Sequence, residues 1–295
     1  MTSSATHRPR RRGWWILGSL ALVVLALPLG CSMFGPQFAP QIDTPQMRDH
    51  DLHSEFADTP FGRMHVVVAG LPAPAAARVL FVHGSPGTWD GWEGYLRDGD
   101  LRLAARMMAP DRLGFGGSER GHAEISLERQ AASLAAVLES EAGPPAVVVG
   151  HSLGGPIAVR LAMDRPDLVA GLLLIAPSID PAQEHHLWYN VFGAMMVVQW
   201  FLPVDWTVSN REIWPLQREL TAMLPLWKSI RCPVILVQGS VDDLVPPENA
   251  DFAEREMAAG QIRVDRYAGE NHFILWKRPE TVKTPLLELL NRNSH

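Results

Sequence analysis

The sequence predicts an α/β fold in which a mostly parallel sheet is flanked by helices. Apolar runs rich in Val, Leu and Ile at residues 78–82, 147–149 and 234–237 have the continuous hydrophobicity of strands buried on both faces. Predicted helical segments alternate with these strands, as the crossovers of a parallel sheet require. A chain of 295 residues with 47% hydrophobic residues can bury one large core of this kind.

The N-terminal segment, residues 1–34, is predicted to lie outside this core. Arginines at positions 8 and 10 to 12 precede an apolar run from Trp14 to Leu29, a pattern typical of an export signal or a membrane anchor. Cys31 follows the small residue Gly30, which resembles the lipidated cysteine of a bacterial lipoprotein signal. Three interpretations remain open: a lipoprotein signal, an uncleaved transmembrane anchor and a cleaved signal. Each places the folded domain outside the cytoplasm, and the first two attach it to the membrane.

Composition and spacing divide the rest of the chain. Residues 35–46 are rich in Pro and Gln and are interpreted as a tether. The core is expected in two pieces, residues 47–177 and 231–295, separated by an insertion at 178–230. A net charge of −6 with scattered basic residues argues against nucleic-acid binding. The two cysteines, Cys31 and Cys232, form neither a disulfide framework nor a metal-ligand pattern, and Cys232 is expected to be a buried apolar residue.

Shorter patterns give the remaining elements in chain order. A pair of edge strands is expected at 51–56 and 62–69. Leucines on one face and an N-terminal Ser126 predict a helix over 126–141. The other expected strands lie at residues 107–109, 172–175 and 263–267, and the other expected helices at 89–96, 156–163, 247–259 and 279–290.

The stretch Gly150-His151-Ser152-Leu153-Gly154 lies between the strand at 147–149 and the helix at 156–163. In this strand, turn and helix context, G-x-S-x-G is typical of a nucleophile elbow with a strained serine at its apex. Flanking glycines are needed because a Cβ would collide with the neighbouring strand or helix. The helix N-terminus then points at negative charge that develops beside Ser152. Taken alone, the pattern would also fit an ordinary glycine-rich turn.

Two further motifs make the chain resemble the α/β-hydrolase superfamily, in its serine-nucleophile, esterase- and lipase-like branch. The strand at 78–82 runs into His83-Gly84-Ser85-Pro86-Gly87, and a glycine-rich stretch from Asp111 to Ser118 precedes the elbow. The resemblance implies that the backbone N–H groups of Ser85 and Leu153 bind the oxyanion of a tetrahedral intermediate. Residues 111–118 are expected to be mainly a structural turn.

The same resemblance implies the two partners of Ser152. Asp242 follows the strand at 234–237 in the position of the family's triad acid, with Asp243 and Asp180 as alternatives. His272 follows the last predicted strand and completes the chain order Ser, Asp, His. The family commonly has glycine directly before this histidine, whereas this chain has Asn271, which leaves the loop geometry open.

The insertion at 178–230 resembles the helical lid that the family places after its sixth strand. It contains half of the ten tryptophans, and its apolar stretch at 191–202 is too short to span a bilayer. Its side chains are expected to form an apolar acyl pocket or to lie on the membrane surface, while part of them packs the lid onto the core. Trp188, Met195 and Trp200 are the candidate substrate-binding residues.

Taken together, the motifs and the resemblance predict a serine hydrolase that cleaves small-molecule carboxylic esters with apolar acyl or aryl groups through an acyl-enzyme. No metal and no organic cofactor are implied. Amide hydrolysis, carbon–carbon bond hydrolysis, perhydrolysis and acyl transfer use the same triad and remain alternatives. A non-catalytic binding module on this fold is the alternative from another class.

Overall fold

The computed structural model describes residues 42–44, 47, 48, 50–72, 77–185 and 202–292. Within them, eight strands form one sheet in the order β1-β2-β4-β3-β5-β6-β7-β8. β1 and β2 are antiparallel, β2 runs antiparallel to β4, and the other neighbours are parallel. The predicted mostly parallel sheet is therefore confirmed. The strands are β1 His53–Thr59, β2 Gly62–Gly70, β3 Ala77–Val82, β4 Ala105–Pro110, β5 Ala146–His151, β6 Val169–Ile175, β7 Val234–Gly239 and β8 Ile262–Tyr267.

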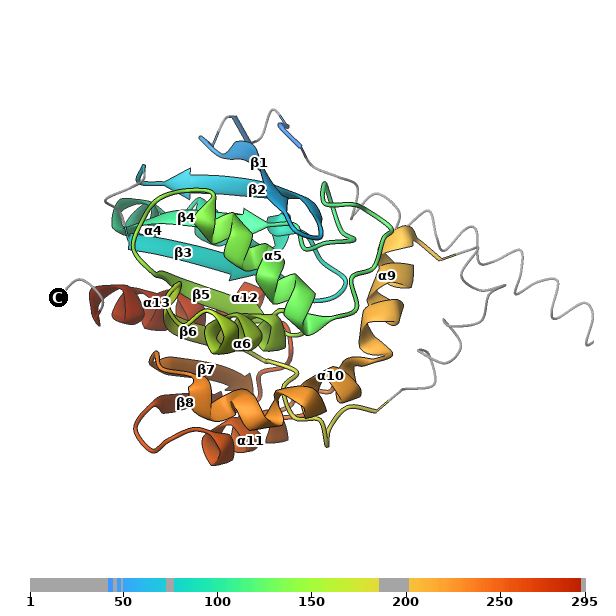
Figure 1. Cartoon of the computed structure of the whole chain (residues 1–295). Helices are drawn as coiled ribbons and strands as arrows, with labels where there is room; N and C mark the ends of the chain where they lie inside the picture. Colours follow the sequence, from blue (N-terminus) through green and yellow to red (C-terminus); the bar gives the residue numbers. More distant parts are fainter. Residues whose placement is uncertain (1–41, 45–46, 49, 73–76, 186–201, 293–295) are drawn as a thin grey trace, which may run out of the picture.

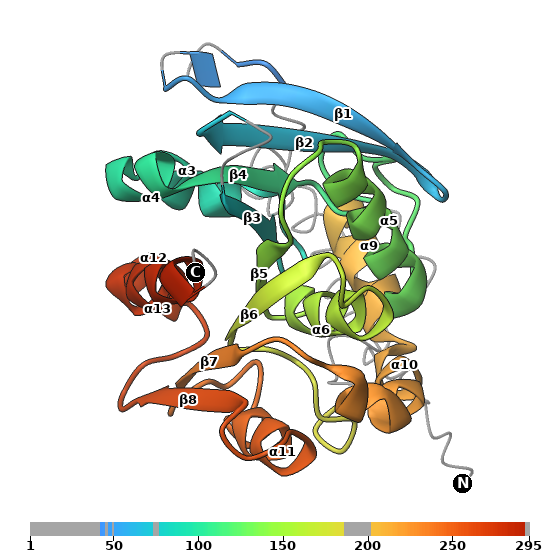
Figure 2. The same ribbon diagram turned by 60° about the vertical axis from the view of Figure 1, so that its left-hand side comes forward.

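Helices cover both faces of this sheet (Figures 1 and 2). One face packs against α5 Leu127–Glu139, α6 Gly154–Asp164 and α11 Glu248–Glu256. The other packs against η2 Trp89–Trp92, α3 Glu93–Leu96, α4 Gly99–Ala104, α12 Ile274–Lys277 and α13 Glu280–Arg292. Two apolar clusters result, one on each side of strands that are themselves almost fully buried. The continuous hydrophobic runs in the sequence reflect this double burial.

The strand order reverses between β3 and β5. After β3 the chain crosses to β4 on one side, then returns to β5 on the other side, so β3 pairs with both. In open α/β sheets, ligands bind at the carboxyl ends of strands beside such a reversal. The loops that follow β3 and β5 carry residues 83–87 and 152–153, which places the two oxyanion motifs side by side.

Most predicted elements are present with shifted ends. The helix expected at 126–141 is α5, and Ser126 caps it by accepting a hydrogen bond from the Arg129 N–H. The single helix expected at 89–96 is divided into η2 and α3. The short helices α4 and α12 were not predicted, because four to six residues provide too little periodicity.

The described part of the insertion after β6 is helical. It contains α9 Val204–Ile213, α10 Leu216–Met223 and η3 Leu224–Ser229. α9 lies near the carboxyl ends of the parallel strands, and the chain then runs through α10 to η3, which leads into the start of β7 (Figure 1). Residues 186–201 lie outside the described residues, and with them the candidates Trp188, Met195 and Trp200. The same holds for Cys31 and the N-terminal segment. In the part of the chain that the structure describes, no helix has the length and apolarity to cross a membrane.

Candidate active site

Ser152 lies at the sharp turn between β5 and α6. Its φ is +54°, a left-handed conformation that non-glycine residues rarely adopt. The Ser152 N–H donates to Ile175 O at 3.0 Å, and its carbonyl accepts from Gly155 N at 2.9 Å. The backbone is thus held on both sides of the strained residue, and the side chain is left partly exposed.

The glycines around Ser152 are required by close backbone approach. A Cβ on Gly150 would lie 2.6 Å from Gly154 O, and one on Gly154 would lie 2.3 Å from Val82 O. A Cβ on Gly84 would lie 3.0 Å from the Ser152 Cβ. The loop after β3 therefore packs directly against the elbow, which only residues without a side chain allow.

Asp242 and His272 form a buried pair at the ends of β7 and β8. Asp242 Oδ2 lies 2.8 Å from His272 Nδ1, and the two side chains are 0% and 7% exposed. The other carboxylate oxygen, Oδ1, accepts from Leu244 N at 2.9 Å and Val245 N at 2.8 Å. The carboxylate is therefore fixed, and it holds the imidazole with Nδ1 as donor and Nε2 facing away.

The elbow and the His272 loop meet through His151. His151 Nε2 lies 3.2 Å from His272 O, and the two imidazole centroids are 4.7 Å apart. Ser152 follows His151 directly, so the contact between the elbow and the His272 loop lies next to the strained serine. No hydrogen bond joins Ser152 Oγ to His272 within the described chain, so Nε2 is uncommitted; such bonds often tighten only when substrate binds.

The two expected oxyanion donors are available. Among the hydrogen bonds of the described residues, neither Ser85 N–H nor Leu153 N–H donates to any acceptor. Leu153 occupies the N-cap position of α6, where the helix leaves amide groups unpaired. Gly84, the residue before Ser85, contacts Ser152. Two unpaired amides therefore flank the serine, as an oxyanion site requires.

Two histidines beside the site are held neutral. Burial, reinforced by the neighbouring His272, lowers the pKa of His151 to about 3. Burial and then the Arg112 guanidinium hold the pKa of His83 well below its usual value. His83 Nε2 accepts from Arg112 N at 2.9 Å, and its Nδ1 donates to Gly84 O at 2.8 Å. The structure therefore places both as fixed parts of the loops, in keeping with their position inside the motifs.

The other candidates lie elsewhere. Asp180 accepts from Ala182 N in its own turn and lies 3.9 Å from Arg255, while no hydrogen bond or ion pair joins Asp243 to His272 in the described structure. Burial raises the pKa of the Cys232 thiol to about 11, which keeps it unreactive at neutral pH. No group of three or more His, Cys, Asp or Glu side chains among the described residues could hold a metal ion.

A buried ion pair beside the oxyanion motif was not predicted. Arg112 and Glu212 are each 1% exposed in their side chains, and their closest atoms are 2.8 Å apart. Glu212 lies on α9, 100 residues further along the chain, so no local pattern links it to Arg112. One signal was present: on a helix over 204–213, Asp205 and Glu212 share a face with Val208, which places two acids on an otherwise buried side.

Comparisons with known proteins agree with this geometry. A family model described as alpha/beta hydrolase fold matches residues 77–212. A lipase (LipV) of Mycobacterium tuberculosis is 38% identical over 121 residues, which cover 39% of this chain and 42% of the lipase. Haloalkane dehalogenase 2 of the same species is 31% identical over 134 residues, covering 44% of each chain. The matches thus span less than half the length of either relative.

A solved structure extends the likeness to nearly the whole chain. It is that of a bacterial membrane phospholipase A, with a TM-score of 0.64 and 18% identity, over 94% of this chain and 98% of the phospholipase. At this identity the likeness concerns the fold. The sheet order, the strained serine after β5 and the family-model match lead to the same conclusion: the chain has the α/β-hydrolase fold, and its residues 77–212 match the family of that name.

Proposed function

We propose that this hydrolase cleaves carboxylic esters, with Ser152 as nucleophile, His272 as general base and acid, and Asp242 as the carboxylate that orients the base. The observation that carries the proposal is the buried Asp242–His272 pair, which contacts His151 directly before the strained Ser152. Backbone strain at one residue and a buried carboxylate–imidazole pair both cost free energy, and both cluster at active sites. Their occurrence next to each other therefore favours a catalytic role.

The proposed reaction follows from these positions. Ser152 Oγ attacks the ester carbonyl carbon while His272 Nε2 takes its proton, and Asp242 stabilises the imidazolium. The carbonyl oxygen becomes an oxyanion that accepts from the Ser85 and Leu153 N–H groups. His272 then gives the proton to the departing alcohol, leaving an acyl-enzyme. His272 then takes a proton from water as the water oxygen attacks the acyl carbon. It returns this proton to Ser152 Oγ as the acyl carbon–Oγ bond breaks, which releases the acid and free Ser152.

An apolar acyl or aryl group fits the surroundings of the pair. Phe273 and Trp276 follow His272 and are 46% and 50% exposed, and Leu244, close to Asp242, is 51% exposed. The Phe273 ring lies 5.8 Å from the His272 ring, and Trp276 lies 5.3 Å from His151. Exposed apolar side chains gathered at a reaction centre favour an apolar substrate. The similarity to a lipase and to the fold of a phospholipase points in the same direction.

Ser152 also separates this proposal from the chemistry of the dehalogenase relative. The family resemblance implies that dehalogenases and epoxide hydrolases require a carboxylate at the elbow, where this chain has a hydroxyl. Amide hydrolysis, carbon–carbon bond hydrolysis and acyl transfer use the same serine triad. We propose ester hydrolysis ahead of these reactions because no described residue favours any of them.

We further propose that residues 1–34 attach the enzyme to a membrane with its catalytic domain outside the cytoplasm. The support is the basic and apolar sequence pattern. Radiolabelled palmitate incorporated by the wild type and lost in Cys31→Ala would support the lipoprotein form. Incorporation by neither protein would exclude it and leave the transmembrane anchor or the cleaved signal.

A panel of nitrophenyl esters of increasing acyl length tests the function. We expect hydrolysis by the wild type with a preference for medium chains or aryl groups, and a loss of at least about 10³-fold in Ser152→Ala. Turnover below detection at every length, by a folded wild type that still reacts with a fluorophosphonate, would favour amides or acyl transfer. A folded wild type that neither turns over nor reacts would favour the binding module.

A further inference from the structure

Arg112 uses every donor of its guanidinium group. Nε donates to His83 O at 2.9 Å and one Nη donates to Gly84 O at 2.9 Å. The remaining N–H groups bind Glu212 at 2.8 and 3.1 Å and Gln130 Oε1 at 2.6 Å. Five donors in a rigid planar fork thus join three separate segments: the loop after β3, α5 and α9.

The Gly84 carbonyl belongs to the same peptide unit as the Ser85 N–H. Because that unit is planar, a hydrogen bond to its C=O also fixes the direction of its N–H. Arg112 Nη2 and His83 Nδ1 both donate to Gly84 O, at 2.9 and 2.8 Å. Donation by a cation to a carbonyl also polarises the peptide, which strengthens its N–H as a donor.

Glu212 supplies the charge that balances Arg112. Its Oε1 accepts from Arg112 and Gln130, and its Oε2 accepts from Arg112 and from Ser85 Oγ at 2.8 Å. The carboxylate therefore holds the side chain of Ser85 while Arg112 holds the adjacent peptide. Buried ion pairs add little net stability because desolvation offsets their attraction. Stability alone is thus a weak reason for this pair.

We propose that Arg112 and Glu212 are positioning residues for the oxyanion site: together they orient and polarise the Gly84–Ser85 peptide so that the Ser85 N–H points at the developing oxyanion. This inference rests on the proposed ester hydrolysis. Because Glu212 comes from α9, it also makes the insertion after β6 part of the transition-state machinery and more than a cover over it.

A second ion pair provides a matched control. Arg120 and Asp205 also join α9 to the loop after β4, with contacts of 3.2 and 2.6 Å, and the Asp205 side chain is 1% exposed. Within the described residues, this pair makes no hydrogen bond to residues 83–85. Asp205→Asn should therefore disturb the attachment of α9 without touching the oxyanion peptide.

The test compares the full-length Glu212→Gln and Asp205→Asn variants on a nitrophenyl ester that the wild type hydrolyses. We expect kcat to fall about 10- to 100-fold in Glu212→Gln with KM within about threefold, because the lost interaction acts in the transition state. Asp205→Asn should keep kcat within about twofold, whatever its Tm. Equal losses of kcat in the two variants, or an unchanged kcat in Glu212→Gln, would overturn the proposal.

A spectroscopic measurement separates this inference from the proposed function. With ¹⁵N-serine labelling, the Ser85 amide signal, assigned by its loss in Ser85→Ala, should shift in Glu212→Gln and stay in place in Asp205→Asn. A Ser85 amide signal that stays in place in both variants would refute the positioning role of Glu212, even if the wild type is an active esterase. A wild type without esterase activity would instead refute the proposed function. If Glu212→Gln does not fold, Gln130→Leu replaces it, because this substitution removes one hydrogen bond from Arg112 and one from Glu212. We then expect kcat to fall about 2- to 5-fold. A Ser85 amide signal that does not move in Gln130→Leu would contradict the proposal.

Discussion

At two places in the described part of the chain, an aspartate holds the Nδ1 of a buried histidine at 2.8 Å. One is Asp242 and His272 near Ser152, and the other is Asp111 and His65 with Ser54. Both aspartates also accept backbone N–H groups: Asp242 those of residues 244 and 245, and Asp111 those of residues 89 and 117. The residue types and the aspartate–histidine distances therefore do not distinguish the two sites.

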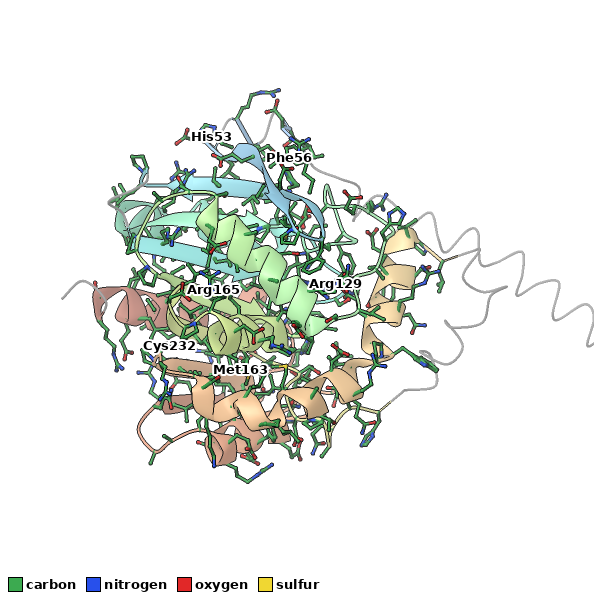
Figure 3. All side chains as sticks on the ribbon, in the orientation of Figure 1. His53, Phe56, Arg129, Met163, Arg165 and Cys232 are labelled. Atoms are coloured by element: carbon green, nitrogen blue, oxygen red, sulfur yellow. The ribbon has the colours of Figure 1, made fainter. Side chains whose placement is uncertain are left out.

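The difference lies at the far nitrogen and at the serine. His65 is 0% exposed, and its Nε2 is bound to Ser54 Oγ at 2.7 Å, so both ring nitrogens are occupied. Ser54 lies in the regular edge strand β1, paired with Val67. In Figure 3, the labelled His53 and Phe56 mark this strand at one edge of the sheet. The labelled Cys232 directly precedes β7, which lies near the other edge. Ser152 instead has a left-handed backbone and two unpaired amides beside it.

A serine, a histidine and an aspartate linked in series by hydrogen bonds are therefore not sufficient for acyl transfer. A nucleophile also needs an exposed, strained position and oxyanion donors without other partners. We interpret the Asp111–His65–Ser54 arrangement as a scaffold that binds β1, β2 and the loop after β4 together. Substitutions at Asp242 and His272 should abolish the activity of the folded enzyme. Substitutions at Asp111, His65 and Ser54 should lower stability and leave the folded enzyme active.

Replacing the two histidines should give the largest contrast. In His272→Gln we expect activity per folded molecule to fall by about 10³- to 10⁴-fold, because proton transfer is lost. In His65→Gln we expect activity per folded molecule within about threefold of wild type and a loss of roughly 2–3 kcal/mol in unfolding free energy, since buried partners lose their bonds. Initial rates and urea unfolding measure both. Equal loss of activity in the two variants would break the comparison.

Amide substitution of the two aspartates comes next. Asp242→Asn should lower kcat by roughly 10³-fold, because an amide no longer holds the imidazole in the required tautomer. Asp111→Asn should leave the folded fraction active but cost roughly 2–4 kcal/mol, because Oδ1 and Oδ2 accept from Trp89 N, Gly117 N and His65. Steady-state kinetics beside thermal unfolding distinguishes them. A stable, fully active Asp242→Asn would remove Asp242 from the mechanism.

The neutral histidines at the elbow predict a pH dependence of stability. The folded-state pKa of His151 is lowered from 6.5 to about 3. The unfolded chain therefore binds the extra proton first, so this stabilisation is complete above pH 6.5 and is lost as the pH falls toward 3. Between pH 7 and 5 the loss should be on the order of 1–2 kcal/mol.

His151→Gln should flatten this dependence. The pKa of His83 is lowered in the same direction, so part of the slope should remain in the variant. Urea unfolding at several pH values measures the slope. A wild type whose stability is constant from pH 7 to 5, or a variant with an unchanged slope, would contradict the assignment of His151 as a buried neutral group.

The smallest effect is expected at the scaffold serine. Ser54→Ala removes the 2.7 Å hydrogen bond to His65 and should cost about 1 kcal/mol of unfolding free energy. Its kcat and KM for esters should equal those of the wild type, because β1 lies at the edge of the sheet. A tenfold loss of kcat in this variant, with Tm almost unchanged, would give Ser54 a role in the chemistry.

The sequence was informative wherever a local pattern carries the structure. Buried strands are continuous apolar runs, and the glycines of the elbow are demanded by approaches as close as 2.3 Å, so both could be predicted. The positions of Ser152, Asp242 and His272 could be proposed from motifs at strand ends. Arg112 with Glu212 could not be predicted, because their pairing is a tertiary contact between segments 100 residues apart. The contact of Ser54 with His65 depends on the register of β1 against β2, which the expected pair of edge strands does not specify.

The most direct test of the central claim is to map where a fluorophosphonate reacts. The full-length folded protein is treated with the reagent and digested, and the modified peptide is identified by mass spectrometry, with Ser152→Ala as the control. We predict one label per molecule on Ser152, none on Ser54, and none in Ser152→Ala. A folded wild type without label, a label on Ser54, or equal labelling of Ser152→Ala would contradict the account.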